Sequence, residues 1–148
     1  MRRIIAFLFV GISLIVLNEI KINEFDFLND FDSMTIVCES KIDGIDSFVK
    51  NGNQYYYTFD SNQKNMLNKI EYEGVVFNFT QKFDLDCFIN SVDYISHSND
   101  ELKGYEIYYG YYGDYKDYRY IDGKKINFQL AKHDSTWTLG FPLILTGF

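Results

Sequence analysis

An uninterrupted apolar run near the N-terminus sets the strongest limit on what this chain can fold into. No residue from Ile4 to Leu17 is charged, and Arg2 and Arg3 stand directly before the run. Because such a run has no polar face to turn toward water, it would have to be a core helix buried on every side if it belonged to a soluble domain. It is shorter than the about 20 residues of a membrane-spanning helix and is typical of a signal-peptide core. We therefore expect residues 1–17 to be a signal peptide or an uncleaved hydrophobic anchor helix.

The residues after the run favour an anchor that stays attached. Cleavage requires small residues in an A-x-A arrangement, whereas residues 16–20 read Val-Leu-Asn-Glu-Ile. The arginines before the run place the N-terminus in the cytoplasm and the rest of the chain outside. We expect residues 18–33 to form an acidic stalk and residues 34–148 a single domain. The expected location is the extracytoplasmic side of the cell membrane, with the membrane as a partner through Ile4 to Leu17, or the medium if the signal is cleaved.

The exported part of the chain is acidic. Without Arg2 and Arg3 it carries 12 basic and 21 acidic side chains, a formal charge of −9. A field of this sign repels nucleic acid and anionic lipid head groups, so we expect no nucleic-acid partner. The two cysteines, Cys38 and Cys87, match no zinc or CxxC spacing. They could pair in an exported chain, and buried free thiols are the alternative.

Alternation of apolar and polar residues predicts strands through most of the domain. The expected strands cover residues 35–39, 54–59, 75–80, 106–112, 115–121, 124–132 and 136–144. Asp122-Gly123 between two alternating runs predicts a two-residue hairpin turn. One short helix is expected after Asp60, and a second after Asp84 with apolar residues at 85, 88, 89 and 92. The prediction is an α+β fold, a mainly antiparallel sheet with two helices packed on one face.

The titratable residues form no catalytic pattern. Asp114, Asp117 and Asp122 lack the ligand spacing of a calcium loop. His97 and His133 each lie in a polar stretch that we interpret as a turn, without a partner motif. We therefore expect no catalytic residue, no metal site and no cofactor. An acid pair assembled only by the fold is the remaining route to hydrolase chemistry.

The most unusual stretch holds eight tyrosines between Tyr105 and Tyr120. A tyrosine ring can stack on a sugar or on a partner protein, although tyrosine is also a favoured strand residue. Ile107 shares a strand face with Tyr109 and Tyr111, which indicates that this face is buried. The predicted binding surface is the outward set on the other face and in the turn: Tyr108, Tyr112 and Tyr115.

Residues 126–131 read Ile-Asn-Phe-Gln-Leu-Ala, and residues 138–148 read Thr-Leu-Gly-Phe-Pro-Leu-Ile-Leu-Thr-Gly-Phe. This end resembles the YwmB family of Gram-positive bacteria, whose members tend to finish with an N-x-Q-[IL]-A strand, a T-[VI]-G-x-P-[IL] segment and a terminal aromatic residue. The resemblance implies a fold similar to the TATA-box-binding protein, with a curved antiparallel sheet, and an association with spore-forming bacteria. It implies no catalytic residues, and DNA binding does not follow from the fold.

The function expected from these features is a non-enzymatic, exported and membrane-anchored interaction domain of the cell envelope, linked to sporulation by the resemblance. Its partner would be an envelope protein or a wall component. Two alternatives stay open. One is a carbohydrate- or peptidoglycan-binding module that uses the tyrosines from Tyr105 to Tyr120, and the other is an envelope hydrolase with an acid pair.

Overall fold

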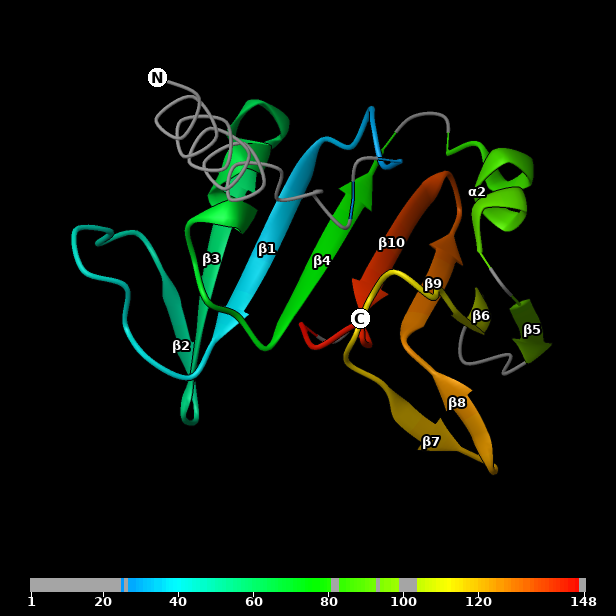
Figure 1. Ribbon diagram of the computed structural model, residues 1–148. Coiled ribbons are helices and arrows are strands. Elements are labelled where there is room, and N and C mark those ends of the chain that lie inside the picture. The colour runs from blue at the N-terminus through cyan, green and yellow to red at the C-terminus, as the bar shows by residue number, and fades with distance from the viewer. Residues whose placement is uncertain (1–24, 26, 81–82, 93, 99–103, 147–148) are drawn as a thin grey trace, which may run out of the picture.

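A computed structural model describes residues 25, 27–80, 83–92, 94–98 and 104–146 of the 148-residue chain. Their main element is one eight-stranded antiparallel sheet with the order β2-β3-β1-β4-β10-β9-β6-β5 (Figure 1). The run from Ile4 to Leu17 and its expected helix lie outside the described residues. Within the part that the structure describes, no helix is long and apolar enough to cross a membrane.

The strands and helices of the structure can be compared directly with the predicted fold class. The sheet strands are β1 (Ser33–Cys38), β2 (Val49–Asn51), β3 (Gln54–Asp60), β4 (Gly74–Phe79), β5 (Tyr94–Ser98), β6 (Tyr105–Tyr111), β9 (Phe128–His133) and β10 (Thr136–Phe141). A separate hairpin is formed by β7 (Arg119–Ile121) and β8 (Lys124–Ile126). The two helices among the described residues are the 3-10 helix η1 (Ser61–Asn68) and the α-helix α2 (Leu85–Ser91). The predicted α+β class, a mainly antiparallel sheet with two helices, is confirmed.

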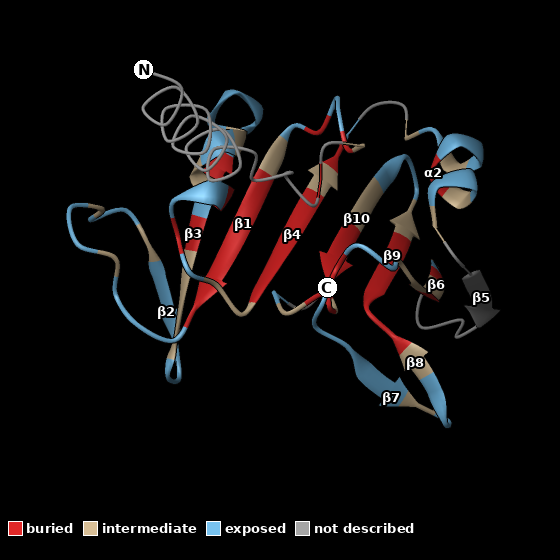
Figure 2. Cartoon of the chain, in the orientation of Figure 1, coloured by how far each residue is buried: buried red, intermediate tan, exposed pale blue. Residues whose placement is uncertain are grey.

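The main core lies on one face of the sheet. In β4, Val75, Phe77 and Phe79 join the main cluster, and the residues between them face the other way. Leu67 of η1 and Phe88 of α2 belong to this same cluster, so both helices contribute to one core. Figure 2 shows the central strands β1 and β4 buried along most of their length.

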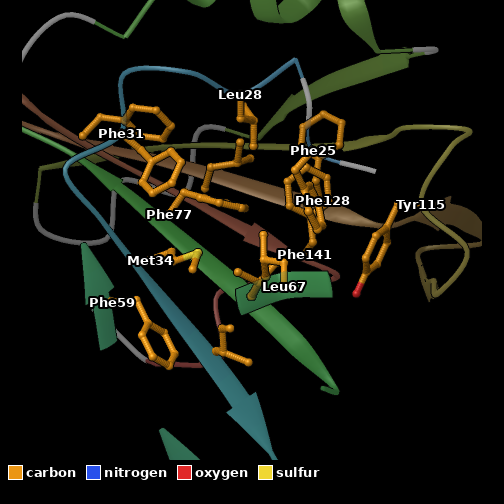
Figure 3. Packing of buried hydrophobic residues seen from close by; sticks show 14 of the residues in the cluster. Phe25, Leu28, Phe31, Met34, Phe59, Leu67, Phe77, Tyr115, Phe128 and Phe141 are labelled. Atoms are coloured by element: carbon orange, nitrogen blue, oxygen red, sulfur yellow. The ribbon is translucent and has the colours of Figure 1, made fainter. Parts of the chain in front are cut away.

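The segment before β1 is part of this core. Phe25, Leu28 and Phe31 are 1%, 4% and 4% exposed and pack over the sheet (Figure 3). The ring centroid of Phe31 lies 5.1 Å from that of Phe77, in an edge-on arrangement. Residues 18–24 of the stalk expected over residues 18–33 lie outside the described residues, and the expectation is wrong for the three residues that are buried in the core, Phe25, Leu28 and Phe31. These phenylalanines alternate with acidic residues in the sequence. Burial of their rings in the core gives a gain in free energy that a stalk exposed to water could not provide.

The opposite face is partly covered by the chain that follows β10. The side-chain Oε1 of Gln129 accepts a hydrogen bond from the backbone N–H of Ile144, at 3.1 Å. A Cβ added to Gly140 would lie 2.5 Å from the carbonyl of Leu143, so only glycine lets this segment lie so close to β10. Ile144, Val76 and their neighbours form a second, smaller cluster on this face. Both faces of the sheet therefore bury apolar side chains.

Some predicted boundaries are wrong. The strand expected over residues 115–121 is reduced to Arg119–Ile121, and the strand expected over 124–132 is interrupted at Asn127. The predicted turn is confirmed, because Asp122 and Gly123 both have positive φ, 49° and 75°. The edge strands β2 and β5 were not predicted. Since β5 includes His97, the turn expected there is a strand.

The two cysteines are free thiols in the structure. Cys38 is buried at the end of β1, and Cys87 is exposed on α2. Burial, assisted by the nearby charge of Glu73, raises the pKa of the Cys38 thiol to about 11. The disulfide considered from the sequence is therefore not formed, and Cys38 stays protonated and unreactive at neutral pH.

Candidate functional site

Tyr115 is not part of an exposed surface. Its ring is 3% exposed and packs 5.3 Å from the ring of Phe141 and 5.7 Å from that of Phe25. The chain turns inward here because the Tyr115 ring fills the core beside the segment that precedes β1, as Figure 3 shows. The expectation that Tyr115 points outward is therefore wrong.

Tyr108 and Tyr112 are half-buried and lie against the main core. Tyr108 pairs with Leu130 in the sheet register, so its ring shares the core face and stacks 6.5 Å from Trp137. The Tyr112 ring centroid is 4.7 Å from that of Phe27. The outward orientation expected for these two rings is therefore wrong, because Tyr108 of β6 and Tyr112 directly after it lie on the side that the main core covers. Their part in binding stays a prediction.

The exposed tyrosines of the stretch belong to the β7–β8 hairpin. Tyr118 is 41% exposed and Tyr120 is 68% exposed. Their rings meet edge to face, with centroids 5.6 Å apart and planes at 89°, so they share a face as the strand period predicts. Figure 1 shows the hairpin extending away from the sheet beyond β9, and Figure 2 shows that its surface is largely exposed.

A lysine joins these rings into one surface. The Lys125 Nζ lies 4.1 Å from the ring centroid of Tyr118 and 4.7 Å from that of Tyr111, and it donates a 3.0 Å hydrogen bond to the Tyr111 hydroxyl. That hydrogen bond raises the pKa of Lys125, so the ammonium stays charged through the physiological range. We call Tyr111, Tyr118, Tyr120 and Lys125 the tyrosine platform.

The hairpin carries a charge opposite to that of the chain around it. Residues 116–125 contain four basic and two acidic residues, whereas the chain after the apolar run has a formal charge of −9. The basic residues are Lys116, Arg119, Lys124 and Lys125. The platform is therefore a locally positive, aromatic surface on an acidic domain. It attracts negatively charged groups, which the rest of the domain repels.

Asn127 fixes the base of the hairpin. Its side chain is fully buried; Nδ2 donates to the carbonyls of Tyr112 and Tyr115 at 2.6 Å and 2.9 Å, and Oδ1 accepts from the backbone N–H of Tyr112 at 2.7 Å. The side chain thus pairs the polar backbone groups of the loop that leads into β7. This role could not be predicted from the sequence, because Asn127 continues the alternation of polar and apolar residues that indicates one strand over residues 124–132.

A pair of carboxyl groups lies at the far end of β1 and the start of β4. Glu39 and Glu73 share a side-chain hydrogen bond, which raises the pKa of Glu39. Both line an open pocket of about 680 Å³, and the Gln54 amide donates to Glu73 at 2.9 Å. Glu39 is exposed and Glu73 only half-buried. The pair therefore lacks the burial that keeps a general acid protonated near neutral pH.

The remaining polar candidates whose side chains the structure describes do not gather into a catalytic set, and the side chain of His97 lies outside that description. The His133 ring stacks on Tyr105 with centroids 4.4 Å apart, and its Nδ1 lies 3.8 Å from a carboxylate oxygen of Asp134. Among the described residues, no group of three or more His, Cys, Asp or Glu side chains could hold a metal ion. His133 is thus a surface histidine at the end of β9.

Comparison with protein-family models, with curated proteins and with solved structures finds no match for this chain. The resemblance to the YwmB family therefore stays a prediction that depends on the C-terminal residues. The candidate site depends on geometry alone, namely two exposed rings and a lysine on a hairpin that a buried asparagine holds in place.

Proposed function

We propose that this chain is a non-enzymatic, exported interaction domain of the cell envelope, anchored through the run from Ile4 to Leu17, and that the tyrosine platform is its contact surface. The observation that carries the proposal is the exposure of Tyr118 and Tyr120 beside Lys125. Both rings are exposed to water on a rigid hairpin. A partner that covers them buries apolar surface, and this burial favours binding. Tyrosine is also among the residues that dominate binding energy at protein interfaces.

A carbohydrate or peptidoglycan ligand is the second candidate. Tyr118 and Tyr120 present ring surface to solvent, and such surface can stack on a sugar. Lys125 adds a donor within reach of the same ligand. The Glu39–Glu73 pair gives the hydrolase alternative less support, because Glu39 is exposed.

The family resemblance adds a biological setting to the proposal. On this proposal the sheet is the curved sheet of the fold similar to the TATA-box-binding protein, with both helices on one face. The envelope role would then belong to a spore-forming Gram-positive bacterium. The charge of −9 after the apolar run supports a role that involves no nucleic acid.

Replacing Tyr118, Tyr120 and Lys125 together by serine tests the contact surface. Capture of the partner by crosslinking in the native cells should fall at least about tenfold, because the loss of two hot-spot rings exceeds about 1.4 kcal/mol. The Tm should move by less than about 3 °C, since the three side chains lie outside the main core.

The matched control is Val49→Ser with Lys50→Ser on β2. Val49 is 67% exposed, and the Lys50 Nζ lies 5.1 Å from the Tyr55 ring, so this pair also removes an exposed apolar side chain and a ring-bound lysine. Capture should be unchanged in this control. Equal capture by the hairpin variant and the control would remove the platform from the proposal. Co-sedimentation of the same proteins with purified cell wall separates a wall ligand from a protein partner.

A further inference from the structure

A pocket of about 230 Å³ opens between the segment that precedes β1 and helix α2. Four phenylalanine rings line it, and they follow one another in contact. The centroid distances are 6.1 Å between Phe27 and Phe88, 5.4 Å between Phe88 and Phe83, and 4.8 Å between Phe83 and Phe79. The rings come from three separate segments of the chain, so the fold alone brings them together.

Burial orders these rings from the interior to the opening. Phe79 and Phe88 are each 3% exposed and belong to the main core, so they close the pocket on its inner side. Phe27 and Phe83 are half-buried and border solvent. A ligand in the pocket therefore meets aromatic surface on more than one side, and none of these rings offers a hydrogen-bond acceptor.

The charged groups among the described lining residues are both carboxylates. Asp30 and Asp84 line the pocket and are exposed. Asp84 also accepts a 2.9 Å hydrogen bond from the backbone N–H of Cys87, which fixes its carboxylate at the start of α2. The chain after the apolar run has a formal charge of −9, which adds to the local negative potential.

We propose that this pocket binds an alkylated ammonium group of the choline type. The negative faces of aromatic rings attract a cation, and an aromatic cage favours a quaternary ammonium because its methyl groups are apolar and need no hydrogen-bond acceptor. A primary ammonium is strongly hydrated, and the aromatic inner wall formed by Phe79 and Phe88 offers it no acceptor in place of the water that it would lose there. The carboxylates at the opening select the cation over a neutral ligand of the same shape.

The test is a titration of choline into the full chain in a non-ionic maltoside micelle. Calorimetry measures the affinity, and fluorescence of the sole tryptophan, Trp137, reports occupancy because its ring lies 5.2 Å from Phe83. The neutral isostere 3,3-dimethylbutan-1-ol should bind at least about tenfold more weakly than choline, since it lacks the charge. Equal binding of the two compounds, or no binding of choline, would overturn the proposal.

The variant Asp30→Asn with Asp84→Asn removes the charge with little effect on the fold. Asp30 has φ of 62°, a region that asparagine tolerates, and asparagine caps a helix as well as aspartate does. The choline Kd should rise about tenfold in this variant. The control, Asp122→Asn with Asp134→Asn, makes the same charge change at two positions outside the pocket lining that share the positive φ of Asp30. Its Kd should change less than about twofold, and an equal rise in both variants would mean that only the overall charge matters.

Phe83→Leu and a second ligand complete the experiment. Leucine keeps an apolar side chain of similar size but removes the aromatic face, so choline binding should weaken while unfolding in urea changes little. Unchanged binding in Phe83→Leu would contradict the aromatic cage. Glycerophosphocholine is titrated in parallel. Binding of choline but not of glycerophosphocholine identifies the ligand as a free, soluble compound. Binding of both shows that the choline head group of a lipid can also be the ligand.

Discussion

Replacement of Asn127 by alanine is expected to lower the free energy of unfolding by about 3–5 kcal/mol, since each buried polar group left without a partner costs about 1–3 kcal/mol. The change removes three hydrogen bonds from the backbone of Tyr112 and Tyr115, although the Tyr112 carbonyl still accepts one from the N–H of Tyr115. It should also loosen the loop that carries the hairpin. Urea unfolding of the full chain in micelles, followed by circular dichroism, measures the loss.

Asn90→Ala is the matched control for this change. Asn90 is an exposed asparagine on α2, so its replacement should change the free energy of unfolding by less than about 0.5 kcal/mol. A loss below about 1 kcal/mol for Asn127→Ala would mean that water or a rearranged loop replaces the side chain. The proposed rigidity of the hairpin would then have no basis.

Phe88→Ala is expected to destabilise the chain by about 3–5 kcal/mol, through lost burial and the cavity that remains. Phe88 is 3% exposed, and its ring centroid lies 5.1 Å from that of Phe128 on the sheet. The same urea titration measures the effect. Ile89→Ala removes a half-buried side chain of the same helix outside the main cluster, and it should cost less than half as much. Equal losses for the two variants would contradict the packing of α2 through Phe88.

Local patterns were sufficient for the elements that bury one regular face. The alternation in β4 and the spacing of apolar residues in α2 predicted both elements to within about two residues, a normal margin for boundaries. The Asp122-Gly123 pair predicted its turn because both residues must adopt positive φ. The edge strands β2 and β5 were missed, because neither carries an alternating run of its own.

Long-range packing explains the errors. Phe25 and Phe31 lie among carboxylates, and nothing in their neighbourhood tells that they cover β4 and β10. The orientation expected for Tyr108 failed because β6 is covered on both faces, by the main core on one side and by the smaller cluster with Ile107 on the other. The burial of one residue in a strand therefore does not show that the opposite face is exposed to solvent.

The residues that prompted the family resemblance have structural roles in this chain. Asn127 pairs the backbone of the loop before β7, Gln129 binds the backbone of Ile144, and Gly140 makes room for Leu143. Each of them joins the C-terminal strands to a loop or to the tail. Their spacing is thus explained by folding and gives no information about a ligand, so the sequence could predict neither the hairpin surface nor the aromatic pocket.

The central claim is that the domain lies outside the cytoplasm. A reporter enzyme that is active only outside the cytoplasm tests this location most directly. Fused to the C-terminus of the full chain, the reporter should be active. Leu8→Lys with Val10→Lys should abolish the activity, because each charge at the centre of the apolar run costs about 2.5–3.5 kcal/mol on insertion. Leu8→Ala with Val10→Ala keeps the run apolar and should preserve it. Activity that survives the two lysines, or a silent fusion of the unaltered chain, would contradict export through the run from Ile4 to Leu17.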